Sequence, residues 1–417
     1  MPYDVLIRGD ERDIAIADGV IAGFEAGPAR EEIDARRLAV LPGVIDAHVH
    51  FNEPGRTDWE GWATGTRALA AGGATACVEM PLNAHPPTID GPAFDAKVAA
   101  ARASAVVDFA LWGGLVPGNL DRLEELAERG VVGFKAFMCD SGIADFPAVD
   151  EDTLGAGMAR AAQLGLPVAV HAEDPATLRA PNGTGWRDFV ASRPAAAEHR
   201  AIETAIALAR ETGCSLHVVH VSTAHGVDLV ARSDATCETC PHYLTLTEDD
   251  LETLGTRAKC APPLRSAAER DALWQRIGDL AFIASDHSPC PPDMKAGDFT
   301  AAWGGIAGCQ TLLPLLLDAG LALDEVVRLT SAGPAVRLRL PKGGIAPGAD
   351  ADLVLVDLDD RHARELHDRH RLSPFAGRPL RGRVVRTLVR GTTVFRDGRI
   401  VAGPLGRLLT PTKGDPA

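Results

Sequence analysis

Short apolar runs alternate with longer amphipathic stretches through the middle of the chain. Eight runs, rich in Val, Ala and Phe, have the length and the near-continuous apolar character of buried strands. They span residues 43–51, 74–80, 106–115, 131–138, 167–173, 215–222, 235–244 and 280–288. Between them, stretches such as 119–130 and 196–213 carry apolar residues at helical spacing and end in glycine. Strands and helices that alternate in this way are typical of a parallel sheet.

The pattern changes at both ends of the chain. Residues 1–42 and 345–417 contain short strand-like segments with polar turns, and no long helix separates them. The eight strand–helix units lie within residues 43–344, a length that suits a (β/α)8 barrel of the TIM type. We therefore expect an α/β protein in which the two chain termini together form a small β-sandwich beside this barrel.

Composition and charge narrow the classes of function. The net charge of -15 over 417 residues argues against a nucleic-acid partner and against an anionic membrane surface. No run approaches the roughly 20 apolar residues of a membrane span, and the charged start MPYDVLIRGDERD is unlike a signal peptide. The eight cysteines lie mostly inside apolar runs, which favours buried thiols over disulfides. We expect a cytoplasmic protein.

Residues that can bind metal recur where the predicted strands end. His48 and His50 are two positions apart in the strand 43–51, so both side chains project from the same face. Later strands contribute four further candidates at a comparable depth, namely Lys135, His171, His220 and Asp286. Each residue alone has an ordinary structural explanation. In a barrel, however, the C-terminal ends of the strands meet at the active-site face, so their joint placement predicts a metal centre there.

Lys135 is the unusual member of this set. It is flanked by Phe134, Ala136 and Phe137, where a bare ammonium group is costly to bury. It either pairs with a nearby carboxylate or has reacted with CO₂ to form an anionic carbamate. A carbamate can bridge two cations, and four histidines and one aspartate would then complete three protein ligands for each metal. Three protein ligands and one open position are typical of a catalytic site.

Several motifs occur in a fixed order from residue 46 to residue 289. They are DAHVHFNEPG, MPLN, GFKAFM, VHAED, HVVHVST, CPHYLTLT, KCAPPLR and SDHSP. In this combination the chain resembles the cyclic amidohydrolase branch of the amidohydrolase superfamily, which holds dihydroorotases, hydantoinases and allantoinases. The resemblance implies a homotetramer with two divalent metal ions, zinc being the expected metal. The implied ligands are His48, His50, His171, His220 and Asp286, with carboxylated Lys135 as the bridge.

The resemblance also implies a mechanism. A hydroxide held between the two metals would attack the carbonyl carbon of a cyclic amide, while Asp286 acts as general acid and base. His217 lies three residues before His220, so it is expected to point to the opposite face and to pack behind the ligands. His242 and His287 are expected to hydrogen-bond ligands or substrate.

Two positions indicate which ring is opened. Dihydroorotases typically carry Arg and His, which bind a substrate carboxylate, where this chain has Asn52 and Cys290. The chain therefore favours a small neutral cyclic ureide. The strings HFNEPGRTDWEGW and MPLNAHPPT are most similar to those of allantoinases, which convert allantoin to allantoate in purine degradation. Hydantoinase or dihydropyrimidinase activity is the alternative, followed by dihydroorotase activity.

Three further residues are predicted to contact substrate, and each keeps a structural alternative. Asn83 can hydrogen-bond a ring carbonyl or simply form a turn, and Ser288 follows Asp286 by two residues. Gly304 can let a ligand approach the backbone or can belong to an ordinary loop. Some superfamily members have lost their metal ligands and serve as inactive scaffolds. The complete ligand set favours an enzyme here.

Overall fold

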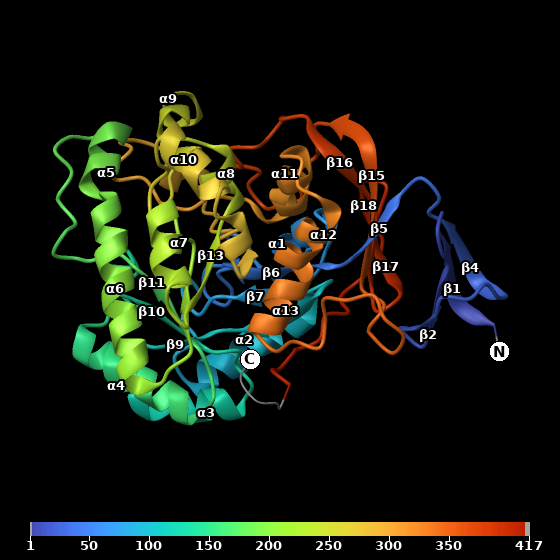
Figure 1. The fold of residues 1–417 in the computed structure, drawn as a ribbon, viewed down its shortest axis with the longest axis horizontal. Coiled ribbons are helices and arrows are strands. Elements are labelled where there is room, and N and C mark those ends of the chain that lie inside the picture. Colours follow the sequence, from blue (N-terminus) through green and yellow to red (C-terminus); the bar gives the residue numbers. More distant parts are fainter. Residues whose placement is uncertain (1, 413–417) are drawn as a thin grey trace.

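The barrel predicted for the middle of the chain is present in the computed structural model, which describes residues 2–412 (Figure 1). Its parallel strands are β6 (Val44–Val49), β7 (Ala74–Glu79), β8 (Asp108–Leu111), β9 (Gly113–Gly114), β10 (Phe134–Phe137), β11 (Val168–His171), β12 (Leu216–Val218), β13 (Thr236–Thr239) and β14 (Phe282–Ile283). Strands β8 and β9 continue one another on either side of Trp112, so these segments form eight strands. All eight runs predicted as strands contain one of them.

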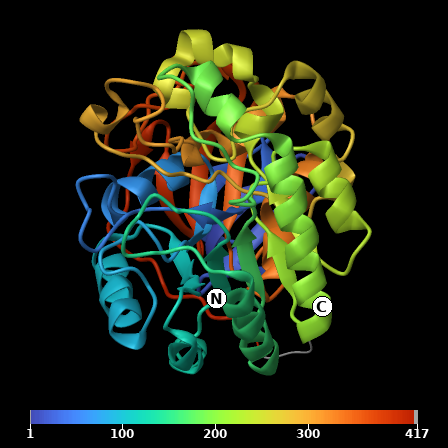
Figure 2. The same cartoon turned by 90° about the vertical axis from the view of Figure 1, so that its left-hand side faces the viewer.

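The sheet closes between its first and last strands. Val49 and His287 form a parallel bridge, and the backbone N–H of His50 donates to the carbonyl of His287 at 2.8 Å. This closure joins the end of β6 to the segment that follows β14, and it confirms the (β/α)8 barrel. In Figure 2 helices surround the central strands.

One predicted strand ends in a helix. The run 235–244 is extended only as far as Thr239, and its second half forms the short helix α8 (Pro241–Thr245). Proline at the first position of a helix loses no hydrogen bond, because that N–H has no intrahelical partner in any case. The prediction was wrong there because apolar composition alone does not separate a short helix from a strand.

The helices follow the strands in chain order. They are α1 (Trp62–Ala71), α2 (Gly91–Ser104), α3 (Leu123–Glu128), α4 (Glu151–Gln163), α5 (Trp186–Ser192), α6 (Ala195–Thr212), α7 (Ala224–Ala231), α9 (Leu251–Leu254), α10 (Ala267–Trp274), α11 (Leu312–Asp318), α12 (Leu323–Val327) and α13 (Gly333–Arg337), besides α8. The predicted helix at 196–213 is α6, and Gly213 ends it in the left-handed conformation with a φ of 69°.

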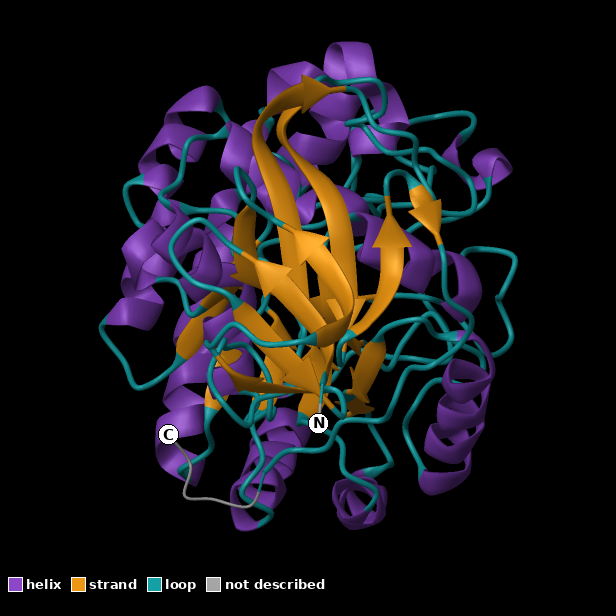
Figure 3. Ribbon diagram, turned by 90° about the vertical axis from the view of Figure 1, so that its right-hand side faces the viewer, coloured by secondary structure: helices purple, strands orange, loops and turns teal. Residues whose placement is uncertain are grey.

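Two sheets made mostly of antiparallel strands lie beside the barrel, on the right of Figure 1 and facing the viewer in Figure 3. One contains β1 (Tyr3–Arg8), β2 (Ile14–Ala17), β3 (Val20–Gly23) and β4 (Ala29–Asp34), and the other contains β5 (Ala39–Pro42), β15 (Leu353–His362), β16 (Leu380–Val389), β17 (Thr392–Arg396) and β18 (Arg399–Ile400). Strand β5 pairs with β15, so both chain termini contribute to the second sheet. Met1 and residues 413–417, which fall in the ranges predicted for the sandwich, lie outside the described residues.

Two expectations from composition can be compared with the structure. All eight cysteines are free and buried, as expected for thiols in apolar runs. Within residues 2–412, no helix combines the length and the apolar character needed to cross a membrane.

A buried cluster of charges connects the barrel to the second sheet. The Lys342 ammonium group lies 2.7 Å from a carboxylate oxygen of Asp108, on β8, and 2.6 Å from oxygens of both Asp350 and Asp352, which precede β15. Its side chain is only 1% exposed. Burial opposes the charge, but the Asp352 and Asp108 carboxylates raise the pKa of Lys342 above its usual value. The cluster therefore holds together three acidic groups that would otherwise repel one another.

We expect the substitution Lys342→Met to lower the free energy of unfolding by about 3–5 kcal/mol, because buried Asp352 loses its cation and buried Asp108 keeps only Arg390. Chemical denaturation followed by circular dichroism measures the change. Arg187→Met is the matched control, because the Arg187 side chain is 72% exposed and pairs with Glu252 at the surface. The control should change stability by less than about 0.5 kcal/mol. Equal stability of the two variants would contradict the role of Lys342 in holding the barrel to the second sheet.

Candidate metal centre and active site

The structure brings His48, His50 and Asp286 together at the C-terminal ends of the barrel strands. The Asp286 Oδ1 atom lies 3.2 Å from Nε2 of His48 and 3.4 Å from Nε2 of His50. Ligand atoms around one tetrahedral zinc ion lie roughly 3.3–3.6 Å apart, given metal–ligand distances of about 2.0–2.2 Å. One carboxylate oxygen and two ring nitrogens therefore converge as they would around a single divalent cation.

A second pair of histidines converges beside the first group. Nδ1 of His171 and Nε2 of His220 lie 3.0 Å apart, and both rings are buried. The rings of His220 and His48 have centroids 5.6 Å apart, so the two groups are neighbours. Nitrogen and oxygen donors of this kind fit two adjacent divalent cations.

Lys135 lies within the same buried region, on β10. Within the described part of the chain its ammonium group forms no ion pair, and it hydrogen-bonds only the carbonyl of Ala136, at 3.4 Å. The Phe137 ring centroid lies 4.4 Å from its Nζ. Burial lowers the pKa of Lys135 to about 7, with the Asp286 and Glu238 carboxylates opposing that shift. A substantial share of the amine is therefore neutral near pH 7, and only the neutral amine can attack CO₂.

Four non-glycine residues at this site have a positive φ angle. His220 and Asp286 have φ angles of 42° and 45°, and Asn52 and Asn83 have φ angles of 65° and 67°. Residues other than glycine seldom adopt this left-handed conformation, which costs of order 1–3 kcal/mol and is common where function demands an exact side-chain direction. The conformation turns His220 and Asp286 at the ends of their strands toward the other ligands.

Two carboxylates that the sequence analysis did not single out orient the histidines. Glu238, on β13, accepts a hydrogen bond from Nδ1 of His48 at 2.5 Å, and Glu173 lies 2.8 Å from Nε2 of His171. Although burial opposes ionisation, the His48 ring lowers the pKa of Glu238 to about 2. Each carboxylate leaves the other ring nitrogen of its histidine free for a metal. A charged residue inside an apolar strand, as in CETC, was the signal that could have identified Glu238.

Comparisons with known proteins agree with this geometry. The model of the amidohydrolase family matches residues 39–394. This chain belongs to the amidohydrolase family. A protein named allantoinase from Rubrobacter xylanophilus is 57% identical over 99% of this chain and 98% of its own length. Another of that name, from Escherichia coli O1:K1 / APEC, is 42% identical over 94% of this chain and 93% of its own.

Solved structures of the family confirm the fold. An L-hydantoinase (dihydropyrimidinase) from Arthrobacter aurescens superposes with a TM-score of 0.94 at 33% identity, covering 98% of this chain and all of that one (100%). A dihydropyrimidinase from Brevibacillus agri superposes with a TM-score of 0.88 at 28% identity, covering 99% of both chains. The amidohydrolase family and the convergent histidines and aspartate support binding of divalent metal.

Three further histidines of this amidohydrolase lie near the candidate ligands or the barrel seam. His217 is fully buried, and its Nε2 lies 3.2 Å from the second carboxylate oxygen of Glu238, so it packs behind the ligands. His287 accepts a hydrogen bond from the Gly308 N–H at the barrel seam. His242 is buried, its Nε2 has no hydrogen-bond partner, and burial lowers its pKa to about 4. His242 is therefore neutral at physiological pH and keeps one ring nitrogen available.

The residues predicted to contact substrate, Asn83, Ser288 and Gly304, differ in burial. The amide of Asn83 donates to the hydroxyl of Ser288 at 3.5 Å, and both residues are buried. Gly304 is exposed, and a Cβ added there would have its nearest neighbour 4.0 Å away. Gly305 is the residue that needs to be glycine, because a Cβ there would lie 2.3 Å from the Ser288 carbonyl oxygen. This contact is within the protein, so the predicted approach of a ligand at Gly304 stays a prediction.

We expect Glu238→Gln to weaken zinc binding about 10- to 100-fold, because His48 would lose the charged acceptor that fixes its orientation. Titration of the apo-protein against a competing chelator measures the affinity. Glu252→Gln, at an exposed position, is the control and should leave affinity unchanged. An unaltered zinc affinity in Glu238→Gln would show that His48 does not need this partner.

Proposed function

We propose that this amidohydrolase hydrolyses allantoin to allantoate by opening a C–N bond of its ring. The observation that carries the proposal is the identity of 42–57% to proteins named allantoinase over nearly the whole chain. The hydantoinases and dihydropyrimidinases share the fold at 33% identity or less, so their activity is the second candidate.

The surroundings of the site support a neutral substrate. Asn52 is buried, and its amide donates to the carbonyl of Pro289 at 3.4 Å. Cys290 is also buried, and its pKa is raised by burial, so the thiol stays uncharged. A substrate carboxylate would find no cationic group at these two positions. A small cyclic ureide such as allantoin needs none.

Two divalent metal ions, with zinc as the expected metal, would supply Lewis acidity and lower the pKa of bound water to about 7. The residues proposed to hold one ion are His48, His50 and Asp286, and those proposed to hold the other are His171 and His220. Carboxylated Lys135 is proposed to bridge them, since its amine is buried and has no carboxylate partner among residues 2–412.

Asp286 is proposed to move the proton. Burial opposes its ionisation, but the His48 and His50 rings hold the pKa of Asp286 well below its usual value, so it is charged at neutral pH. It accepts the proton of the attacking water and returns it to the ring nitrogen that leaves. The amide of Asn83, the hydroxyl of Ser288 and the Nε2 of His242, which has no hydrogen-bond partner among the described residues, are proposed to orient the ring. A substrate contact at Gly304, a cytoplasmic location and a homotetramer stay predictions.

We expect the metal-loaded protein to convert allantoin to allantoate, and Asp286→Asn to retain no more than about 1% of the rate, since removing a general acid–base typically costs 10²- to 10⁴-fold. Allantoate formation measures the rate, and circular dichroism checks that the variant folds. Rapid turnover by Asp286→Asn would contradict the role of Asp286. Turnover of hydantoins but not of allantoin would keep the chemistry and move the substrate to the second candidate.

We expect Lys135→Ala to lose bound metal and activity together, because the bridging carbamate cannot form. Short-chain carboxylic acids should restore part of both, since a carboxylate can occupy the place of the carbamate. Metal analysis and allantoate formation are the measurements, and intact-protein mass spectrometry tests the native protein for added CO₂. Full activity of a native protein that carries no carbamate would contradict the bridge.

A further inference from the structure

A cavity lies at the opposite end of the barrel from the candidate metal ligands. It has a volume of about 790 Å³, within the range of small-molecule sites. Its walls come from the turns that precede β11, β12, β13 and β14, together with the ends of α6 and α13. These are the N-terminal ends of the strands, whereas His48, His171 and Asp286 lie at the C-terminal ends. No step of the proposed reaction uses this cavity.

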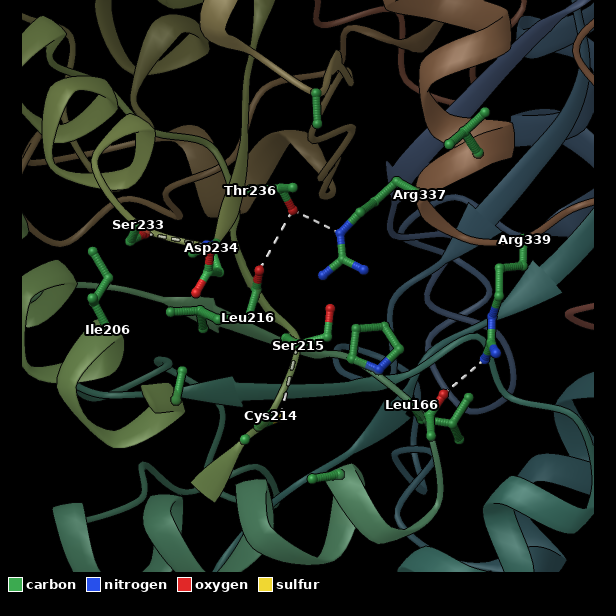
Figure 4. A pocket seen from close by; sticks show the side chains of 18 of the residues that line it. Leu166, Ile206, Cys214, Ser215, Leu216, Ser233, Asp234, Thr236, Arg337 and Arg339 are labelled. Atoms are coloured by element: carbon green, nitrogen blue, oxygen red, sulfur yellow. Dashed lines mark hydrogen bonds between the residues drawn. The ribbon is translucent and has the colours of Figure 1, made fainter. Parts of the chain in front are cut away.

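Arg337 is the chemically unusual residue of this cavity. Figure 4 shows its side chain extending from α13 into the cavity toward Thr236. Its Nε donates to the Thr236 hydroxyl at 2.6 Å, while its buried Nη2 has no hydrogen-bond partner. Among the residues that the structure describes, Arg337 forms no ion pair. Burial lowers the pKa of Arg337 to about 10, so the guanidinium is still charged at neutral pH.

The lining fits an anion attached to an apolar body. Four arginines and one aspartate line the cavity, although the protein as a whole carries a net charge of -15. Apolar side chains that include Leu166, Ile206, Leu216 and Val336 supply much of the wall. We propose that this cavity binds an amphipathic organic anion, with its carboxylate, sulfonate or phosphate on the Arg337 guanidinium and its apolar part against this wall.

A continuous chain of hydrogen bonds connects the cavity to a metal ligand. The Thr236 hydroxyl accepts from Arg337 and lies 2.8 Å from Nδ1 of His217. His217 Nε2 lies 3.2 Å from Glu238, which in turn accepts from His48. An anion on Arg337 neutralises a positive charge at one end of this chain. Divalent cations at the other end should then bind more tightly, and linkage requires the reverse effect to be equal.

The test uses two fluorescent probes of nearly the same shape. 8-Anilino-1-naphthalenesulfonate is an amphipathic anion, and N-phenyl-1-naphthylamine is its neutral counterpart. We expect the anion to bind one site per chain, and Arg337→Met to weaken that binding about tenfold, because a charge-assisted contact is lost. Val336→Glu is the second variant, since Val336 is 64% exposed and a carboxylate at the cavity edge should repel the anion without affecting the fold.

Three results would overturn the proposal. If both probes bind equally well, the cavity is only apolar and has no preference for anions. If neither variant changes the affinity for the anion, that probe binds elsewhere. Chelator competition measures the affinity for zinc. With saturating anion this affinity should rise about fivefold in the native chain and should not change in Arg337→Met. If the anion changes zinc affinity in neither protein, the link to His48 is overturned. None of these measurements uses turnover, so they stand whether or not allantoin is the substrate.

Discussion

The hydrogen bond between the His50 N–H and the His287 carbonyl is the point on which the site depends, because it closes the barrel between its first and last strands. Closure brings the two histidines that end β6 against Asp286, which follows β14 more than two hundred residues later. An open sheet of the same strands would leave those ligands at opposite edges. The parallel direction of every barrel strand then puts Lys135, His171 and His220 at the same end.

Closure places many charges out of contact with water, and several of them are paired with an opposite charge. Glu238 is shared by His48 and His217, and Glu173 is held by Arg193 as well as by His171. Lys342 balances three aspartates where the barrel meets the second sheet. Lys135 and Arg337 form no ion pair among residues 2–412, and the buried cations Lys259 and Arg265 are likewise held by backbone carbonyls rather than by carboxylates. Lys135 lies beside the candidate metal ligands, and Arg337 lies in the cavity at the opposite end, so each lies where binding is proposed.

The two ends of the barrel are joined through side chains rather than through the backbone alone. Thr236 and Glu238 are two residues apart on β13, so both project from one face of that strand. His217, on the neighbouring β12, contacts both of them. The Glu238 carboxylate, which orients His48, is therefore also part of the chain of hydrogen bonds that begins at Arg337. The proposed coupling between metal binding and occupation of the Arg337 cavity runs through Glu238.

The sequence by itself determined the eight-stranded barrel, the strands at both termini and the type of residue at each strand end, because periodicity and spacing are local properties. It did not reveal that Pro241 begins a helix inside an apolar run, or that the backbone of Gly305 packs against Ser288. Only the tertiary structure decided which carboxylate orients His48, since Glu238 is 190 residues away in the chain. The cavity around Arg337 likewise exists only where four strand starts and two helix ends meet. Contacts of this kind depend on strand register and barrel closure, which no short stretch of sequence encodes.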